Sequence, residues 1–165
     1  AIRDAYKRQR QLRSQLEQIA GHINGGHAEP DWTPLRYVNQ NFTHATLTGF
    51  YRAAAVGLVT PLRDGMNLVA KEYVACHDDG SGALVLSEFA GAADELSQAY
   101  LCNPFDIESV KAALLNALKA LDDAPSTMTQ RMLTMHQQVT EHDVQLWSQS
   151  FLGCLRQAEE QGAGA

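Results

Sequence analysis

The chain has 165 residues, of which 45% are hydrophobic, and this is enough for one domain with a core of its own. The formal net charge is −6 and no basic stretch is interleaved with aromatic residues, so no nucleic-acid partner is expected. No apolar run reaches the roughly 18–20 residues of a membrane span, and no signal peptide is recognised. Three widely spaced cysteines, an odd number, favour reduced thiols in the cytoplasm over a disulfide framework.

The N-terminal part is predicted to be one long helix. Four aliphatic residues recur at helical spacing, which predicts an amphipathic helix from about Asp4 to Ile23. The Gly25-Gly26 pair is expected to end this helix, and Pro30 and Pro34 bracket a surface loop after it.

After this loop, short apolar strands alternate with helices. The predicted strands are Leu35–Val38, Val56–Thr60, Ala83–Ser87 and Ala99–Leu101. The predicted helices are Thr46–Ala55, Asn67–Ala75, Ala92–Leu96, Glu108–Leu121 capped by Asp106, Pro125 to about His142, and Asp143–Glu160. This order predicts an α/β fold, a Rossmann-like parallel sheet of about four strands with helices on both faces.

The predicted elements divide the chain into three parts. Residues 1–124 are expected to form a partial Rossmann-like domain, residues 125–161 a pair of C-terminal helices, and residues 162–165 a disordered tail. A complete domain of this type usually has about six strands, so the first strands are expected to be missing from this sequence.

The stretch from Val56 to Glu72 is the most informative one. A β-branched apolar run that ends at Pro61 predicts a buried parallel strand, and Gly65 allows a tight turn into the helix that follows. A strand, a turn and a helix in this order place backbone N–H groups and a positive dipole end at the carboxyl edge of the sheet. The stretch therefore predicts an anion site, framed by the carboxylates of Asp64 and Glu72.

The same stretch, Thr60-Pro61-Leu62-Arg63-Asp64-Gly65-Met66-Asn67-Leu68-Val69-Ala70-Lys71-Glu72, resembles the donor-binding segment of the trehalose-6-phosphate synthases, glycosyltransferase family 20. Further matching motifs are Trp32-Thr33-Pro34, Asn39-Gln40-Asn41-Phe42, Ser87-Glu88-Phe89-Ala90-Gly91-Ala92-Ala93, Asn103-Pro104-Phe105-Asp106, and the pattern of Asp143–Trp147 and Phe151–Leu155. The resemblance covers nearly the whole chain with long motifs.

The resemblance implies a retaining glycosyltransferase of the two-domain GT-B class. It implies transfer of glucose from UDP-glucose to glucose 6-phosphate, with no cofactor, and makes residues 1–124 part of a nucleotide-sugar-binding domain. The acceptor domain and the family's Arg/Lys pair at the diphosphate are expected to be absent, so the isolated chain is expected to be inactive. The resemblance leaves a homo-oligomer open for the full-length enzyme.

Each site residue implied by the resemblance has a plainer alternative. Asp64 is expected to bind the donor sugar as a catalytic residue, whereas an Asp before a helix is often only a cap. Glu72 is expected to bind both ribose hydroxyls, whereas most helical glutamates only face solvent. The remaining UDP-glucose contacts implied are Phe42 beside the uracil and Gly65, Met66, Asn67, Leu68, Val69, Ala70 and Lys71, several of them through backbone N–H groups. The plainer alternatives are a core aromatic for Phe42 and a solvent-facing side chain for Lys71. Arg3 falls where the family has its acceptor-phosphate arginine.

Two other functions remain open from the sequence. Acceptor residues are mostly missing, so a glucosylglycerol-phosphate synthase with the same donor is one alternative. The other is a non-catalytic module that binds a nucleotide-sugar. Metal chemistry is not indicated, because the histidines lack the spacing of a metal pair and no Cys-x-x-Cys is present. Side chains of Leu68 and Val69 are expected to pack in the core.

Overall fold

The computed structural model describes the backbone of residues 2–162 and the side chains of residues 7, 9–149 and 151–157. The chain divides into two compact units, Ala1–Phe42 and Thr43–Ala165. No helix in the described part is long and apolar enough to cross a membrane. The division predicted from the sequence, with a boundary at residues 124 and 125, stays a prediction.

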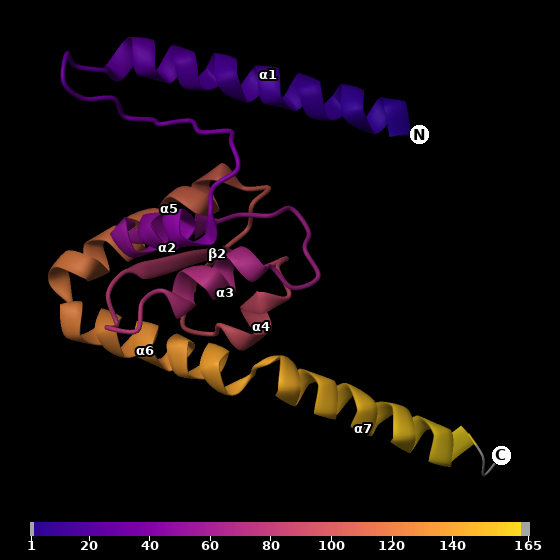
Figure 1. Ribbon diagram of the computed structural model, residues 1–165. Coiled ribbons are helices and arrows are strands. Elements are labelled where there is room, and N and C mark those ends of the chain that lie inside the picture. The colour runs from indigo at the N-terminus through magenta and orange to yellow at the C-terminus, as the bar shows by residue number, and fades with distance from the viewer. Residues whose placement is uncertain (1, 163–165) are drawn as a thin grey trace. The chain divides into compact units, whose positions relative to one another are not determined.

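The first unit consists of helix α1 (Ile2–His27) and an extended segment (Figure 1). The prediction that Gly25-Gly26 ends the helix is wrong, because α1 continues through both glycines to His27. A glycine inside a helix costs only about 1 kcal/mol relative to alanine, which does not by itself stop a helix.

The strand predicted at Leu35–Val38 is also wrong, because this segment pairs with no strand in the part of the chain described. The side chain of Asn24 occupies both backbone groups of Leu35: its amide donates to the carbonyl at 2.8 Å, and its oxygen accepts from the N–H at 3.0 Å. The ladder bonds that a strand would make at Leu35 are thereby replaced. The sheet consequently has three strands, where about four were predicted.

The second unit contains the parallel sheet, in the order β1 (Val56–Val59), β2 (Ala83–Ser87) and β3 (Tyr100–Cys102). Its helices are α2 (His44–Ala53), α3 (Leu68–Ala75), α4 (Ala92–Glu95), α5 (Ile107–Asp123), α6 (Pro125–Glu141) and α7 (Val144–Gly162). The predicted parallel α/β class is confirmed, and most of these bounds lie within one or two residues of the predicted ones. Asp106 caps α5 as predicted, since its carboxylate accepts from the N–H of Glu108.

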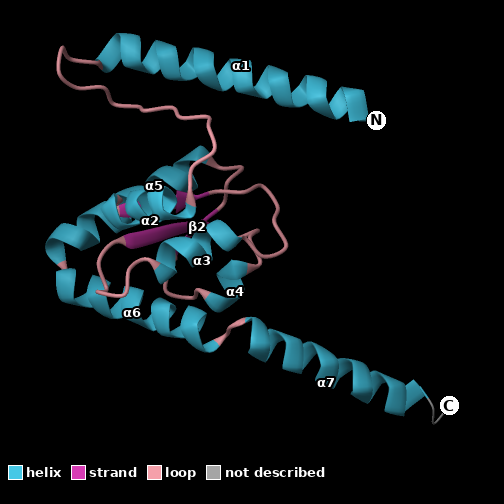
Figure 2. Ribbon diagram, in the orientation of Figure 1, coloured by secondary structure: helices cyan, strands magenta, loops and turns pink. Residues whose placement is uncertain are grey.

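The two faces of β2 pack against different helices, which Figure 2 shows as a strand between α5 and α3. Leu84 and Leu86 belong to one apolar cluster, with residues of α3 and the methionines Met132 and Met135 of α6. Ala83 and Val85 belong to a second cluster, with alanines of α5. Every residue of β2 is buried, as expected for a parallel strand covered on both faces.

Strand β1 is less buried than predicted. Its residues are partly exposed, and Leu58 is 47% exposed, because β1 forms an edge of the sheet in the part of the chain described. Tyr73 of α3 anchors the helix to this strand. A Cβ atom on Gly57 would lie 2.9 Å from the Tyr73 ring, and the Tyr73 hydroxyl donates to the carbonyl of Ala54 at 3.0 Å. The helix therefore approaches β1 closely only because position 57 is glycine.

Candidate nucleotide-sugar site

The turn between β1 and α3 is shaped by Asp64 and Asn67. Asn67 has a left-handed backbone, with φ of 76° and ψ of 88°, and its side-chain oxygen caps α3 by accepting from the N–H of Ala70 at 2.9 Å. One Asp64 carboxylate oxygen accepts from the N–H of Met66, and the other from the Asn67 amide, each at 3.1 Å. Asp64 therefore organises the turn, but the cap of α3 is Asn67, so the alternative that Asp64 caps the helix is wrong.

A second loop, which follows β2, holds this turn in place through the backbone. The N–H of Asp64 donates to the carbonyl of Phe89 at 3.1 Å, and the N–H of Gly91 donates to the carbonyl of Asp64 at 2.9 Å. The N–H of Ala92 donates to the carbonyl of Met66 at 2.7 Å. The loops at the carboxyl ends of two neighbouring strands thus form one continuous surface, where ligands bind in open α/β sheets.

Gly91 makes this loop contact sterically possible. A Cβ atom at position 91 would collide with the carbonyl group of Gly65. Sequence reasoning quoted Gly91 only as part of a motif and assigned it no role. The sequence feature that could have indicated this role is a glycine within a motif that directly follows a predicted buried strand.

The N-terminus of α3 is suited to bind an anion. The first N–H groups of a helix have no partner inside the helix, and here they carry the positive end of the helix dipole. The side chains of Leu68 and Val69 are 61% and 46% exposed, so the prediction that they pack in the core is wrong. The core face of α3 is instead formed by Ala70, Tyr73 and Val74.

Lys71 is not the plain solvent-facing residue that the sequence alternative described. Its ammonium nitrogen lies 2.9 and 2.8 Å from the two carboxylate oxygens of Glu95 in α4, and its side chain is only 17% exposed. This pair connects α3 with α4. Glu95 engages two of the three donors of this ammonium group.

Glu72 lies on the exposed side of α3, about one turn from the helix start. Its Oε2 atom accepts a hydrogen bond from the hydroxyl of Tyr51 in α2 at 3.1 Å. Burial, followed by the contact with Glu72, raises the pKa of Tyr51 above its usual value of 10.0. Between α2 and α3 lies a pocket of about 370 Å³, lined by His44, Leu47, Thr48, Tyr51, Arg52, Glu72, Ala75, Cys76 and Asp78.

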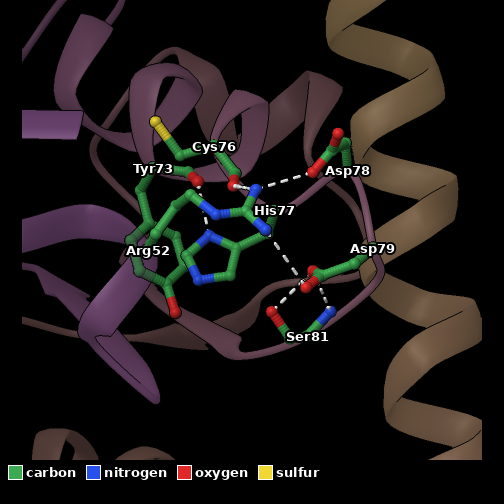
Figure 3. Close-up of polar contacts among 7 residues, drawn as sticks. All are labelled: Arg52, Tyr73, Cys76, His77, Asp78, Asp79 and Ser81. Carbon is green, nitrogen blue, oxygen red and sulfur yellow. Dashed lines mark hydrogen bonds and ion pairs between the residues drawn. The ribbon is translucent and has the colours of Figure 1, made fainter. Parts of the chain in front are cut away.

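The C-terminal end of α3 is held by Arg52, as Figure 3 shows. One guanidinium nitrogen donates to the carbonyl of Cys76 and to the Asp78 carboxylate, both at 2.7 Å, and another lies 3.3 Å from Asp79. The hydrogen bond from Arg52 lowers the pKa of Asp78 below its usual 3.8, and bonds from Ser81 lower that of Asp79. Charged side chains thus fix α2 to the end of α3.

His77 also contacts this end of α3, on the buried side of the helix. Its ring is buried, lies 4.3 Å from the Tyr73 ring between centroids, and its Nδ1 atom is 2.8 Å from the carbonyl oxygen of Tyr73 (Figure 3). Among the side chains that the structure describes, no group of three His, Cys, Asp or Glu could hold a metal ion.

Two predicted contacts cannot be placed with the others. Phe42 is half-buried and ends the first compact unit, whereas Asp64–Glu72 belongs to the second. Arg3 falls in α1, and its side chain lies outside those that the structure describes. Both assignments stay predictions, and the structure brings together the turn at Asp64–Asn67, α3 and the loop around Gly91.

The fold defines the chain as part of a Rossmann-like domain of the GT-B class, with the N-terminus of α3 near the carboxyl edge of a parallel sheet. The sequence pattern of glycosyltransferase family 20 matches residues 2–157, and the chain belongs to this family.

Several relatives are trehalose-6-phosphate synthases. The chain is 49% identical to that of Mycobacterium tuberculosis strain H37Rv, over 93% of this chain and 30% of the relative. It is 51% identical to that of Mycolicibacterium vanbaalenii, over 90% of this chain and 30% of the relative. The chain thus spans about a third of the length of these relatives.

Solved structures of such synthases share the fold. The protein of Burkholderia multivorans is 40% identical with a TM-score of 0.84, and the match covers 98% of this chain and 34% of that one. The E. coli protein bound with UDP-2-fluoro glucose is 46% identical with a TM-score of 0.82, over 90% and 32%. A Burkholderia xenovorans synthase in complex with glucose-6-phosphate is 46% identical with a TM-score of 0.80, over 89% and 32%.

Proposed function

We propose that this chain carries the donor site of an α,α-trehalose-phosphate synthase (UDP-forming), which transfers glucose from UDP-glucose to glucose 6-phosphate with retention at the anomeric carbon. The observation that carries the proposal is the turn at Asp64–Asn67, which presents the N-terminus of α3 at the sheet edge with Glu72 about one turn away. Relatives of the same family that bind UDP-2-fluoro glucose or glucose-6-phosphate support it.

In the proposed reaction the departing diphosphate lies at the N-terminus of α3. Backbone N–H groups of Leu68 and Val69 and the helix dipole stabilise the negative charge that develops as the glycosidic bond breaks. Because these donors are part of the backbone, the side chains at positions 68 and 69 are free to vary without loss of the hydrogen bonds.

The two carboxylates have separate roles in this proposal. Glu72 accepts hydrogen bonds from the two ribose hydroxyls, and Asp64 accepts from hydroxyls of the donor glucose. Each carboxylate oxygen accepts two hydrogen bonds, so Asp64 can hold the turn and a sugar hydroxyl at the same time. Phe42 is proposed to lie beside the uracil and Arg3 at the acceptor phosphate.

We further propose the cytoplasm as the place of this reaction. All three cysteines are free, at positions 76, 102 and 154, which suits a reducing compartment.

Calorimetric titration of the chain with UDP and UDP-glucose tests the donor site. Glu72→Gln keeps the size of the side chain but removes its charge, and a hydrogen bond to a charged group is worth roughly 1.5–3 kcal/mol. Losing the charge is expected to cost about 1–3 kcal/mol. Both ligands contain the ribose, so both should bind roughly 5- to 150-fold more weakly, at about 1.4 kcal/mol per decade. Unchanged affinities would reduce Glu72 to a surface residue of α3.

Asp64→Asn tests the sugar contact and should weaken UDP-glucose while leaving UDP nearly unchanged. The variant also has a structural side effect. In the unaltered chain the Asn67 amide donates to the Asp64 carboxylate, and in the variant this amide can face a second amide group instead. A urea unfolding curve must therefore accompany the titration. Equal weakening of UDP and UDP-glucose would contradict the sugar assignment.

A further inference from the structure

Tyr51 brings a fixed hydrogen-bond donor to a carboxylate on the surface. Its ring is half-buried and packs against the core cluster that contains Tyr73 and Val74, whereas Glu72 is exposed. The Tyr51 hydroxyl donates to Glu72 Oε2 at 3.1 Å across the pocket between α2 and α3. Packing thus fixes the Tyr51 hydroxyl, and the hydrogen bond from this hydroxyl in turn fixes the Glu72 carboxylate.

The Tyr51 hydroxyl is not needed to attach α2 to α3. The next residue, Arg52, already bonds to the carbonyl of Cys76 and to the carboxylate of Asp78 (Figure 3). The Tyr51 ring would keep its packing without the hydroxyl. The hydroxyl therefore acts on Glu72 rather than on the docking of the two helices.

An exposed glutamate gains from being held before a ligand arrives. A free Glu side chain samples several rotamers, and ordering it on binding costs affinity. A carboxylate has about four acceptor positions, so Glu72 can accept from Tyr51 and from two vicinal hydroxyls at once. The phenol of Tyr51, with a pKa raised by burial above its ordinary 10.0, is protonated and therefore a donor at neutral pH.

We infer that Tyr51 is a positioning residue of the nucleotide site, whose hydroxyl holds the Glu72 carboxylate in the orientation that accepts both ribose hydroxyls. This inference rests on the proposed function, because it takes Glu72 as the ribose-binding residue. It adds a residue from α2 that no motif of the donor segment contains. Sequence reasoning missed Tyr51 because the pair is separated by 21 positions and has no local signal.

The experiment compares Tyr51→Phe with the unaltered chain, using UDP and 2′,3′-dideoxy-UDP as probes. We expect UDP to bind about 3- to 10-fold more weakly to the variant, the range of one ordinary hydrogen bond. Binding of 2′,3′-dideoxy-UDP, which lacks both hydroxyls, should be the same for both proteins. Affinities are measured by NMR chemical-shift titration, which also covers millimolar dissociation constants.

Thr48→Val is the matched control. It removes a hydroxyl that lines the same pocket but donates to the carbonyl of His44 within α2. This variant should bind both probes like the unaltered chain. In a double-mutant cycle, Tyr51→Phe should add little to the effect of Glu72→Gln, because both changes act on one interaction.

The outcomes separate the inference from the function on which it rests. If Tyr51→Phe weakens UDP and 2′,3′-dideoxy-UDP equally, the hydroxyl has only a structural role and the inference is overturned. If Glu72→Gln weakens UDP while Tyr51→Phe does not, the inference fails and the proposed function stands. If UDP does not bind to the unaltered chain, or binds equally to Glu72→Gln, the proposed donor site itself fails.

Discussion

The two ends of α3 are fixed by different kinds of interaction. At the N-terminal end, backbone hydrogen bonds join the Asp64–Asn67 turn to the loop around Gly91, and the two loops are in close contact. At the C-terminal end, the guanidinium group of Arg52 bridges a carbonyl and two carboxylates that face solvent. One end depends on backbone geometry, and the other depends on charge.

This difference matches what each end is proposed to do. Ligand-binding N–H groups must be held within a few tenths of an ångström, and backbone contacts provide this without mobile side chains. The C-terminal end only has to keep α2 beside α3, and exposed ion pairs suffice although each contributes little. The N-terminal end should therefore respond to changes of shape, and the C-terminal end to salt and pH.

The largest effect is expected for Gly91→Ala. The new Cβ would collide with the Gly65 carbonyl group, and overpacking of this kind costs about 2–3 kcal/mol of unfolding free energy. UDP binding should be lost with the loop contact. Urea unfolding and UDP titration measure both effects.

Gly65→Ala is the matched control for stability, because a Cβ at that position meets nothing within 4 Å. Its unfolding free energy should stay close to that of the unaltered chain. Equal stability of Gly91→Ala and Gly65→Ala would show that the two loops do not need their close contact.

A medium effect is expected when the cap of α3 is removed. Asn67→Ala loses the hydrogen bond to Ala70 and forces alanine into the left-handed region, which together cost about 2 kcal/mol. Asn67→Gly should cost only a few tenths of a kcal/mol, because glycine adopts a φ of 76° without strain. Thermal or urea unfolding of the two variants checks this ranking, and a glycine variant as unstable as the alanine variant would contradict it.

The smallest effect is expected for Arg52→Ala, and it should depend on conditions. Asp78 has a lowered pKa in the folded chain, so it stabilises the fold above its ordinary pKa of 3.8, and this stabilisation is lost as pH falls through the lowered value. Without Arg52 this acid-dependent loss should shrink, and so should the loss of stability on adding salt.

Two measurements check the Arg52 prediction. Melting temperatures of both proteins are compared across a series of acidic pH values and salt concentrations. Labelling of Cys76 by a thiol reagent should also become faster in Arg52→Ala, because the guanidinium bond to its carbonyl is lost. Labelling that accelerates equally in Gly91→Ala would mean that the two ends of α3 are not independent.

The sequence predicted the elements whose signals are local. Strand β2 was placed at Ala83–Ser87 because five apolar or small residues follow a glycine-rich turn, and Asp106 was recognised as a cap from its position before α5. The Asp64–Asn67 turn was found for the same reason, since the glycine and the carboxylate lie within four residues of each other.

The errors concern residues whose partners are distant in sequence. The apolar segment at Leu35–Val38 has the composition of a strand. The side chain of Asn24, 11 positions earlier, hydrogen-bonds to both backbone groups of Leu35 and replaces strand pairing there. The plainer alternative for Lys71, a side chain that faces solvent, is wrong because its partner Glu95 lies 24 positions away in a different helix. The exposure of Leu68 and Val69 could not be predicted either, because it depends on which side of α3 faces β1 and β2.

The packing of Tyr73 against β1 gives the chain an internal optical reporter. Burial raises the pKa of this phenol to about 12, so its neutral form is favoured in the folded chain. The fold is therefore stabilised by this group below pH 10, and the contribution is lost as the pH rises towards 12. Tyrosinate absorbance in the ultraviolet should then appear late for Tyr73, and an earlier onset in a variant would reveal that α3 has separated from the strand.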